Sequence, residues 1–260
     1  LTPHVYMMKH FPDHVYSSYL AWFLIYKSGL LPTKLNILDI GACPGTVACG
    51  LALFMQSSSS FFATPPMHIC YYSLEKQAQF QYRGLQFWRQ YIEQQKIPTN
   101  LYFRFDTTDI LAYNEQLKVL PKGFFNFIVI SHCLFYDSEE NKKSLEVYRK
   151  IFQESLSSGG YVILIVQIKS FFGFYGMQPK EDIALEKKLV EKLVEELDLK
   201  LEWYKYIISE GRRVPGNNFA SFARKNLSLQ KFINPLKHKY LRLNYDSYYG
   251  IDDYIIIAKR

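Results

Sequence analysis

Cysteine is scarce in this chain, with four among 260 residues. No two of them form a Cys-x-x-Cys pair or share the spacing with histidine that metal sites use, which disfavours a zinc ribbon, an iron–sulfur site and a secreted disulfide framework. We therefore expect no bound metal and a reducing compartment, the cytoplasm. Because the sequence starts at Leu1 without an initiator methionine, this expectation leaves an upstream targeting segment open.

Long apolar runs are also lacking. The longest ones, Leu20–Tyr26, Phe124–Tyr136 and Tyr161–Ile168, are shorter than the ~20 residues of a spanning helix, so we expect a soluble protein. With 48% apolar and 21% charged residues, the composition is that of a globular protein built on one large core. The excess of 31 basic over 24 acidic residues favours anionic partners.

From Leu35 onward, short β-rich apolar runs alternate with helical or loop stretches, a pattern typical of a parallel sheet with crossover helices. The predicted strands are Asn36–Ile40, Met67–Ser73, Leu101–Phe105, Phe125–Ser131, Tyr161–Gln167, Leu201–Ile208 and Tyr254–Ala258. These nearly continuous apolar runs indicate strands covered on both faces. We expect an α/β fold with a Rossmann-like, doubly wound, seven-stranded sheet.

Four further segments complete the predicted organisation. Residues 1–34 are expected to form a lid of one or two helices ahead of the main domain, 35–260, and Glu181–Leu199 has the clearest helical periodicity. Residues 57–66, rich in serine and proline, are expected to form a surface loop. Residues 210–249 form an insertion before the last strand that carries most of the positive charge, interleaved with aromatic residues. That mixture suits either RNA binding or a cap over a small-molecule site.

The strongest signal is the sequence Asn36–Thr46, in which an apolar strand runs through Asp39 into a turn with Gly41 and Gly45 and then into a helical pattern. Glycines in such a turn allow the backbone to approach a ligand closely, and the helix that follows favours electron-rich groups.

This segment resembles the first motif of the class I S-adenosylmethionine-dependent methyltransferases, Asp/Glu-x-Gly-x-Gly-x-Gly. Gly41 and Gly45 match the first and third glycines, whereas Cys43 stands where the middle glycine is usual. The resemblance implies S-adenosylmethionine as cofactor. It also implies that Asp39 orients the methionine amino group and that Gly41, Ala42, Cys43 and Gly45 lie against the methionine and ribose.

Two more carboxylates follow predicted strands. Glu75 ends the second strand, where a carboxylate can accept both ribose hydroxyls; the alternative is a solvated residue that opens the next helix. In the third strand, the resemblance implies that Asp106 or Asp109 accepts the adenine amino group. We favour Asp106, because Asp109 is placed to cap a helix.

The fourth strand ends in Ser131, His132 and, further on, Tyr136, the polar groups nearest the expected point of transfer. We expect Ser131 to line the cofactor site and His132 and Tyr136 to be catalytic, since a neutral histidine can take a proton from an acceptor. An equally open alternative is that His132 only bonds to the backbone or lines the adenine site. Asn126, at the strand's start where the family has aspartate, is expected to affect stability.

Two other features have structural alternatives. Gln167–Met177 reads as an aromatic loop that overhangs the pocket, or as packing under the N-terminal helices. His10 and His14 are spaced i, i+4, but Pro12 interrupts their helical face, so we expect surface or lid residues rather than ligands.

The arrangement is also similar, more narrowly, to the methyltransferase-like proteins of small-ribosomal-subunit assembly. That likeness is carried by Tyr6, Phe11-Pro12, Tyr16, Leu74-Glu75, Ser131–Phe135 and Gly159-Gly160. Three functions follow from the sequence: a methyltransferase acting on RNA or a ribonucleoprotein, an O- or N-methyltransferase of a small aromatic or apolar metabolite, and a non-catalytic binding or assembly protein that keeps the fold.

Overall fold

The fold was analysed in a computed structural model, which describes residues 3–58, 67–94, 100–115, 120–134, 138–208 and 251–260. Its helices are α1 (Pro3–Lys9), α2 (Phe11–Lys27), α3 (Thr46–Ser58), α4 (Ala78–Gln94), the 3-10 helix η1 (Ile110–Glu115), α5 (Ser138–Ser155), α6 (Ile168–Phe174) and α7 (Ile183–Glu196). Its strands are β1 (Lys34–Ile40), β2 (His68–Glu75), β3 (Asn100–Thr107), β4 (Phe125–Ser131), β5 (Leu156–Gln167), β6 (Lys200–Ile208) and β7 (Asp252–Lys259).

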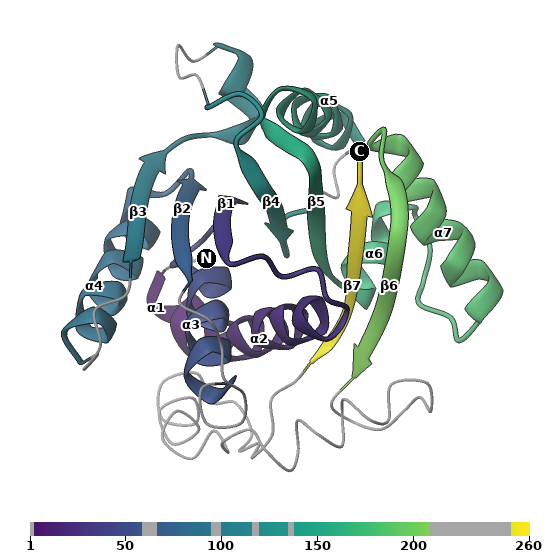
Figure 1. Ribbon diagram of the computed structural model, residues 1–260. Coiled ribbons are helices and arrows are strands. Elements are labelled where there is room, and N and C mark those ends of the chain that lie inside the picture. Colours follow the sequence, from purple (N-terminus) through teal and green to yellow (C-terminus); the bar gives the residue numbers. More distant parts are fainter. Residues whose placement is uncertain (1–2, 59–66, 95–99, 116–119, 135–137, 209–250) are drawn as a thin grey trace.

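The seven strands form one twisted sheet in the order β3-β2-β1-β4-β5-β7-β6 (Figure 1). Strands β1 to β5 pair in parallel, and β7 runs antiparallel to both of its neighbours, β5 and β6. All seven predicted strands are confirmed, and the structure extends several of them by one to five residues. The predicted Rossmann-like fold is therefore confirmed.

Helices cover both faces of the sheet, which explains the continuous apolar strands (Figure 1). One core joins side chains of α2, α3 and α4 to one face, and the other joins those of η1, α5, α6 and α7 to the opposite face. Residues 35–40 of β1 are all buried. Each large side chain buried in these layers stabilises the fold by ~1.5–3 kcal/mol.

The two helices expected near the N-terminus are present, and α2 belongs to the core. Trp22 of α2 is 1% exposed, donates a hydrogen bond to the Val47 carbonyl oxygen at 3.2 Å and meets the Phe127 ring edge-on. A Cβ added at Gly50 of α3 would lie 2.6 Å from the Ser18 Cβ, so the absence of a side chain lets the two helices approach closely. None of the described helices is long and apolar enough to cross a membrane.

Helix α6 and residue Asn126 bear on two expectations from the sequence. The prediction that Gln167–Met177 is an overhanging loop is wrong, because 168–174 form helix α6 and Phe171 and Phe172 are fully buried in the core. Asn126 has the structural role expected of it, since its side-chain oxygen accepts the Asn36 backbone N–H at 2.9 Å and ties β4 to β1. Residues 59–66 and 210–249 lie outside the described residues.

Candidate active site

The predicted site residues lie at the carboxyl ends of β1, β2, β3 and β4, at the edge of the sheet where ligands bind in open α/β folds. In the register of the sheet, Asp39 of β1 lies beside Ser73 of β2, and Leu74 lies beside Asp106 of β3. The antiparallel direction of β7 brings its first residues, Asp252 and Asp253, to the same edge. Sequence positions far apart are thereby brought to one edge.

The turn after β1 has the conformation that its glycines permit. Gly41 and Gly45 have φ angles of +68° and +84°, and a Cβ at Gly41 would lie only 2.6 Å from the Cys133 sulfur. Cys43 also has a positive φ, +50°, which explains why glycine is usual at that place. The Cys43 residue is held there by a hydrogen bond from its backbone N–H to Glu75 at 2.8 Å.

Asp39 is fully buried at the end of β1. One carboxylate oxygen accepts a hydrogen bond from the Tyr71 hydroxyl, and the other, Oδ1, has no partner among the described residues. Burial raises the pKa of Asp39 to about 7; the Tyr71 hydrogen bond lowers it in part and the charge of Glu75 raises it further. A buried acceptor without a donor is costly, so this atom is suited to a donor group of a ligand.

Glu75 is 6% exposed and is not the solvated residue of the alternative interpretation. Its two oxygens accept the backbone N–H groups of Cys43, at 2.8 Å, and Gln77, at 2.9 Å. Burial raises its pKa, and these backbone hydrogen bonds partly offset that effect. Glu75 thus joins the end of β2 to the glycine turn while each oxygen keeps lone pairs for further donors.

The two carboxylates of the β3 region differ in their partners. Asp109 accepts the Leu111 backbone N–H at 3.1 Å, at the start of η1, and forms an ion pair with Lys76 at 2.7 Å. Its expected role as a helix cap is therefore observed. Asp106 lies within β3 and forms an ion pair with Arg104 at 3.0 Å.

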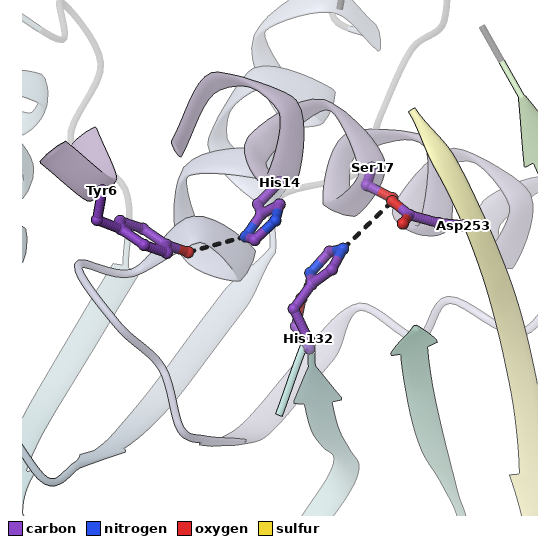
Figure 2. A network of polar contacts seen from close by, with 6 residues as sticks. Tyr6, His14, Ser17, His132 and Asp253 are labelled. Carbon is purple, nitrogen blue, oxygen red and sulfur yellow. Dashed lines mark hydrogen bonds and ion pairs between the residues drawn. The ribbon is translucent and has the colours of Figure 1, made fainter. Parts of the chain in front are cut away.

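At the end of β4, His132 takes a left-handed conformation with φ of +53°, uncommon for a residue other than glycine. Its Nδ1 lies 2.9 Å from the Ser131 hydroxyl, and its Nε2 lies 3.3 Å from Oδ2 of Asp253. Figure 2 shows the His132 and Asp253 side chains pointing toward one another. The Asp253 carboxylate also accepts a hydrogen bond from the Ser17 hydroxyl of α2.

His14 was expected to lie at the surface or in a lid. It lies in α2 and packs against the end of β4. Pro12 lies in the first turn of α2, where it does not interrupt the helix, and the His14 ring stacks on the His132 ring, 3.6 Å away with an interplanar angle of 0°. The Tyr6 hydroxyl of α1 lies 2.9 Å from His14 Nδ1 (Figure 2) and also contacts the Cys43 thiol. The N-terminal helices thus reach both the glycine turn and His132.

Sequence reasoning missed Tyr6, His14, Ser17 and Asp253 as members of this site. The signal for His14 was its i, i+4 spacing from His10, which a proline in the first helical turn does not spoil. No comparable signal marked Asp253, since it stands at the start of an ordinary apolar strand. Tyr136, predicted to be catalytic, lies outside the described residues. Within the described ranges, no three His, Cys, Asp or Glu side chains are arranged to hold a metal ion.

Comparison with known proteins points to one fold. No family model matches the chain, and no curated protein matches it. Among solved structures, it is similar to an S-adenosylmethionine-dependent methyltransferase from Methanosarcina mazei, with 14% identity over 90% of this chain and 96% of that one and a TM-score of 0.51. A second, from Clostridium acetobutylicum, has 11% identity over 98% of this chain and 96% of that one and a TM-score of 0.52. Together with the strand order, these likenesses show that the chain has the class I S-adenosylmethionine-dependent methyltransferase fold.

Proposed function

We propose that the protein is an S-adenosylmethionine-dependent methyltransferase. The observation that carries the proposal is the glycine turn between Asp39 and Glu75, at the carboxyl ends of β1 and β2 in a sheet of this strand order. When bound, the cofactor supplies a methyl group on a positively charged sulfur. The residues described below would hold it.

The polar groups of the turn suit the cofactor's own polar groups. The unpartnered Oδ1 of Asp39 is a buried acceptor and would receive the methionine ammonium group. Glu75, the acidic residue at the end of β2, would accept the ribose hydroxyls. Gly41, Ala42, Cys43 and Gly45 would lie against the methionine and ribose, with Ser131 beside them.

For the adenine amino group we propose Asp106 rather than Asp109. Both carboxylates form an ion pair, Asp106 with Arg104 and Asp109 with Lys76, but Asp109 is also committed to the first turn of η1 as a cap.

The conformation of Cys43 also bears on the third function expected from the sequence, a fold kept without catalysis. Because cysteine adopts the left-handed angle that this turn requires, the departure from the usual glycine leaves the turn's geometry intact.

The expectation that RNA is the methyl acceptor depends on residues 210–249, which lie outside the described part of the chain. No described residue supports it. His132, at the end of β4, is the group we propose to act on the acceptor.

Calorimetric titration with S-adenosylmethionine and S-adenosylhomocysteine tests the cofactor. We expect micromolar binding by the natural protein and a ~10–100-fold weaker affinity in the isosteric variants Asp39→Asn and Glu75→Gln, each of which removes one charge-assisted hydrogen bond. Asp109→Asn, on the same edge of the sheet, is the matched control and should bind normally. No binding at millimolar ligand by the folded natural protein would refute the proposal.

The pH dependence of binding gives a second test. The pKa of Asp39 is about 7 in the structure, and an ammonium group beside it would lower that pKa, so binding should release a proton and strengthen as the pH rises through about 7. Titrations in buffers of different ionisation enthalpy measure that proton. In Asp39→Asn the release should vanish.

A further inference from the structure

We infer that His132, held between Asp253 and His14, removes the proton from an O–H or N–H methyl acceptor. The substrate class is then an alcohol, a phenol or a protonated amine. This inference rests on the proposed methyltransferase function and adds to it the acceptor chemistry and the positioning residues Asp253 and His14.

The partners of His132 decide which ring nitrogen is basic. The Asp253 carboxylate accepts only, so Nε2, at 3.3 Å from it, carries the ring proton. The Ser131 hydroxyl, 2.9 Å from Nδ1, then donates to the free lone pair of that nitrogen. Nδ1 is therefore the atom that can take a proton, at the carboxyl end of β4 where the acceptor is expected.

Asp253 supplies a fixed negative charge behind the ring. Although burial raises the pKa of this carboxyl, the contact with the His132 imidazole and the hydrogen bond from Ser17 hold it below its ordinary value, with a smaller effect of His14. An ionised carboxylate beside Nε2 stabilises the imidazolium that forms when Nδ1 is protonated. The contact at 3.3 Å is long for a hydrogen bond, as such contacts often are before substrate binds.

His14 covers the face of the same ring without adding charge. Burial lowers its pKa well below the ordinary 6.5; the charges of His132 and His10 lower it further and that of Asp253 raises it. Burial also raises the pKa of Tyr6, so its hydroxyl stays protonated beside His14 Nδ1, 2.9 Å away. A neutral His14 allows His132 to become cationic at 3.6 Å without like-charge repulsion.

The backbone of His132 favours a functional interpretation over simple strand termination. Its left-handed conformation is sterically unfavourable for a residue with a side chain, and it is fixed by a hydrogen bond from its N–H to the Ile165 carbonyl oxygen at 2.7 Å. This conformation aims the imidazole at α2 and β7, as Figure 2 shows. Strained residues of this kind concentrate at functional sites.

The proton and electron balance of the step is simple. A lone pair of the acceptor O or N forms a bond to the methyl carbon while the bond from that carbon to sulfur breaks, and its electron pair stays on sulfur. The Ser131 hydroxyl, which donates to Nδ1, takes the acceptor's proton as it passes its own proton to Nδ1 of His132, and the imidazolium pairs with Asp253. A protonated amine loses this proton before its lone pair attacks. A thiol acceptor would need this help least, because thiols ionise near neutral pH by themselves.

The first test observes the imidazole directly. In protein with ¹⁵N-labelled histidine, assigned by comparison with His132→Asn, we expect the neutral His132 ring to carry its proton on Nε2. Asp253→Asn replaces a side chain that only accepts with one that can also donate, so it should weaken this preference and place part of the ring proton on Nδ1. The matched control Asp252→Asn alters the neighbouring residue of β7, which bonds to Tyr206, and should leave the tautomer unchanged. A proton on Nδ1 in the natural protein, or the same tautomer in both variants, would overturn the inference.

The second test follows methyl transfer from S-adenosyl-[methyl-³H]methionine to phenols, alcohols, amines and thiols, and to RNA and protein fractions. At pH 6.5, His132→Asn should reduce transfer ~100-fold or more and Asp253→Asn ~10-fold. Both deficits should shrink as the pH rises and acceptors ionise unaided, a response that a purely structural role would not produce.

The two proposals fail in different ways. If the natural protein binds the cofactor but labels no acceptor, methyl transfer itself is refuted, and this inference with it. If transfer occurs to thiols alone, or survives His132→Asn at pH 6.5, only the role of His132 is refuted.

Discussion

The imidazole rings of His14 and His132 lie parallel, 3.6 Å apart, although one comes from α2 and the other from the end of β4. The stack joins the N-terminal helices to the edge of the sheet where the glycine turn lies. It buries His14 beside a second titratable ring, and its consequences can be measured in stability as well as in activity.

Replacing His14 with glutamine should destabilise the protein by about 1–3 kcal/mol at pH 8, because the stack is lost and the Tyr6 hydroxyl loses its hydrogen-bond partner. The native pKa of His14 is lowered from 6.5, so the unfolded chain binds a proton that the native state does not, and the natural protein loses stability as the pH falls below 6.5. The deficit of His14→Gln should therefore shrink between pH 6.5 and 5 in urea denaturation. His68→Gln, at an exposed position of β2, is the control, and a deficit constant with pH would contradict the prediction.

Asp39 should produce a pH dependence of the opposite sign. Its native pKa is raised from 3.8 to about 7, so its contribution to stability is full below 3.8 and is lost as the pH rises through about 7. Asp39→Asn should remove this loss and be more stable than the natural protein at pH 8, by on the order of 2–4 kcal/mol. Tyr71→Phe removes the hydrogen bond that lowers the pKa and should shift the loss to higher pH. Chemical denaturation from pH 4 to 8 measures both effects; parallel curves for Asp39→Asn and the natural protein would refute the assignment.

Gly41 should tolerate no side chain. Gly41→Ala places a methyl group 2.6 Å from the Cys133 sulfur at a φ of +68°, so we expect a loss of more than ~1–2 kcal/mol and weaker cofactor binding. In the double variant with Cys133→Ala, the steric clash of the new methyl group should be relieved while the backbone strain remains. The losses of stability from the two changes should therefore not be additive. Additive losses of stability in thermal unfolding would show that the contact with Cys133 is not what excludes a side chain at position 41.

Phe171 should be a residue of the core rather than of the pocket. It is fully buried in α6 and contacts Phe172, Tyr175 and Tyr254. Phe171→Ala should therefore lower the free energy of unfolding by about 3–5 kcal/mol and leave the affinity of the folded protein for S-adenosylmethionine unchanged. A large loss of affinity with little loss of stability would instead support a stacking role.

The sequence predicted best those features that a single local pattern of residues determines. Apolar runs predicted every strand, most clearly the central strands β1, β4 and β7, which are buried on both faces, although the edge strands β3 and β6 are only partly buried. The glycine turn with Asp39 and Glu75 was visible because its residues lie at strand ends. Whether Cys43 fits the glycine turn could not be predicted from the sequence, because its fit depends on a positive φ and on the hydrogen bond to the Glu75 carboxylate.

The partners of His132 could not be predicted, because they are brought together by tertiary structure rather than by spacing. Asp253 reaches His132 only because β7 enters the sheet antiparallel, beside β5. His14 reaches it only because Pro12 opens α2 instead of interrupting it. The aromatic residues of 168–174 were misjudged as a loop because two glycines suggested a turn, whereas burial of Phe171 and Phe172 stabilises a short helix.

The hydrogen bond from Ser17 to Asp253 spans 236 positions of the chain. During synthesis, α2 leaves the ribosome early, yet its partner on β7 is made almost last, so the polar cluster around His132 can form only after nearly all of these residues have been translated. A nascent chain can build the β1 to β5 region and bury much of its core while this cluster is still missing. Proton transfer would then require the completed fold. Pulse-labelled nascent chains halted before β7 should show native-like protection of the β1 to β5 strands from hydrogen exchange, without the ion pair between His132 and Asp253.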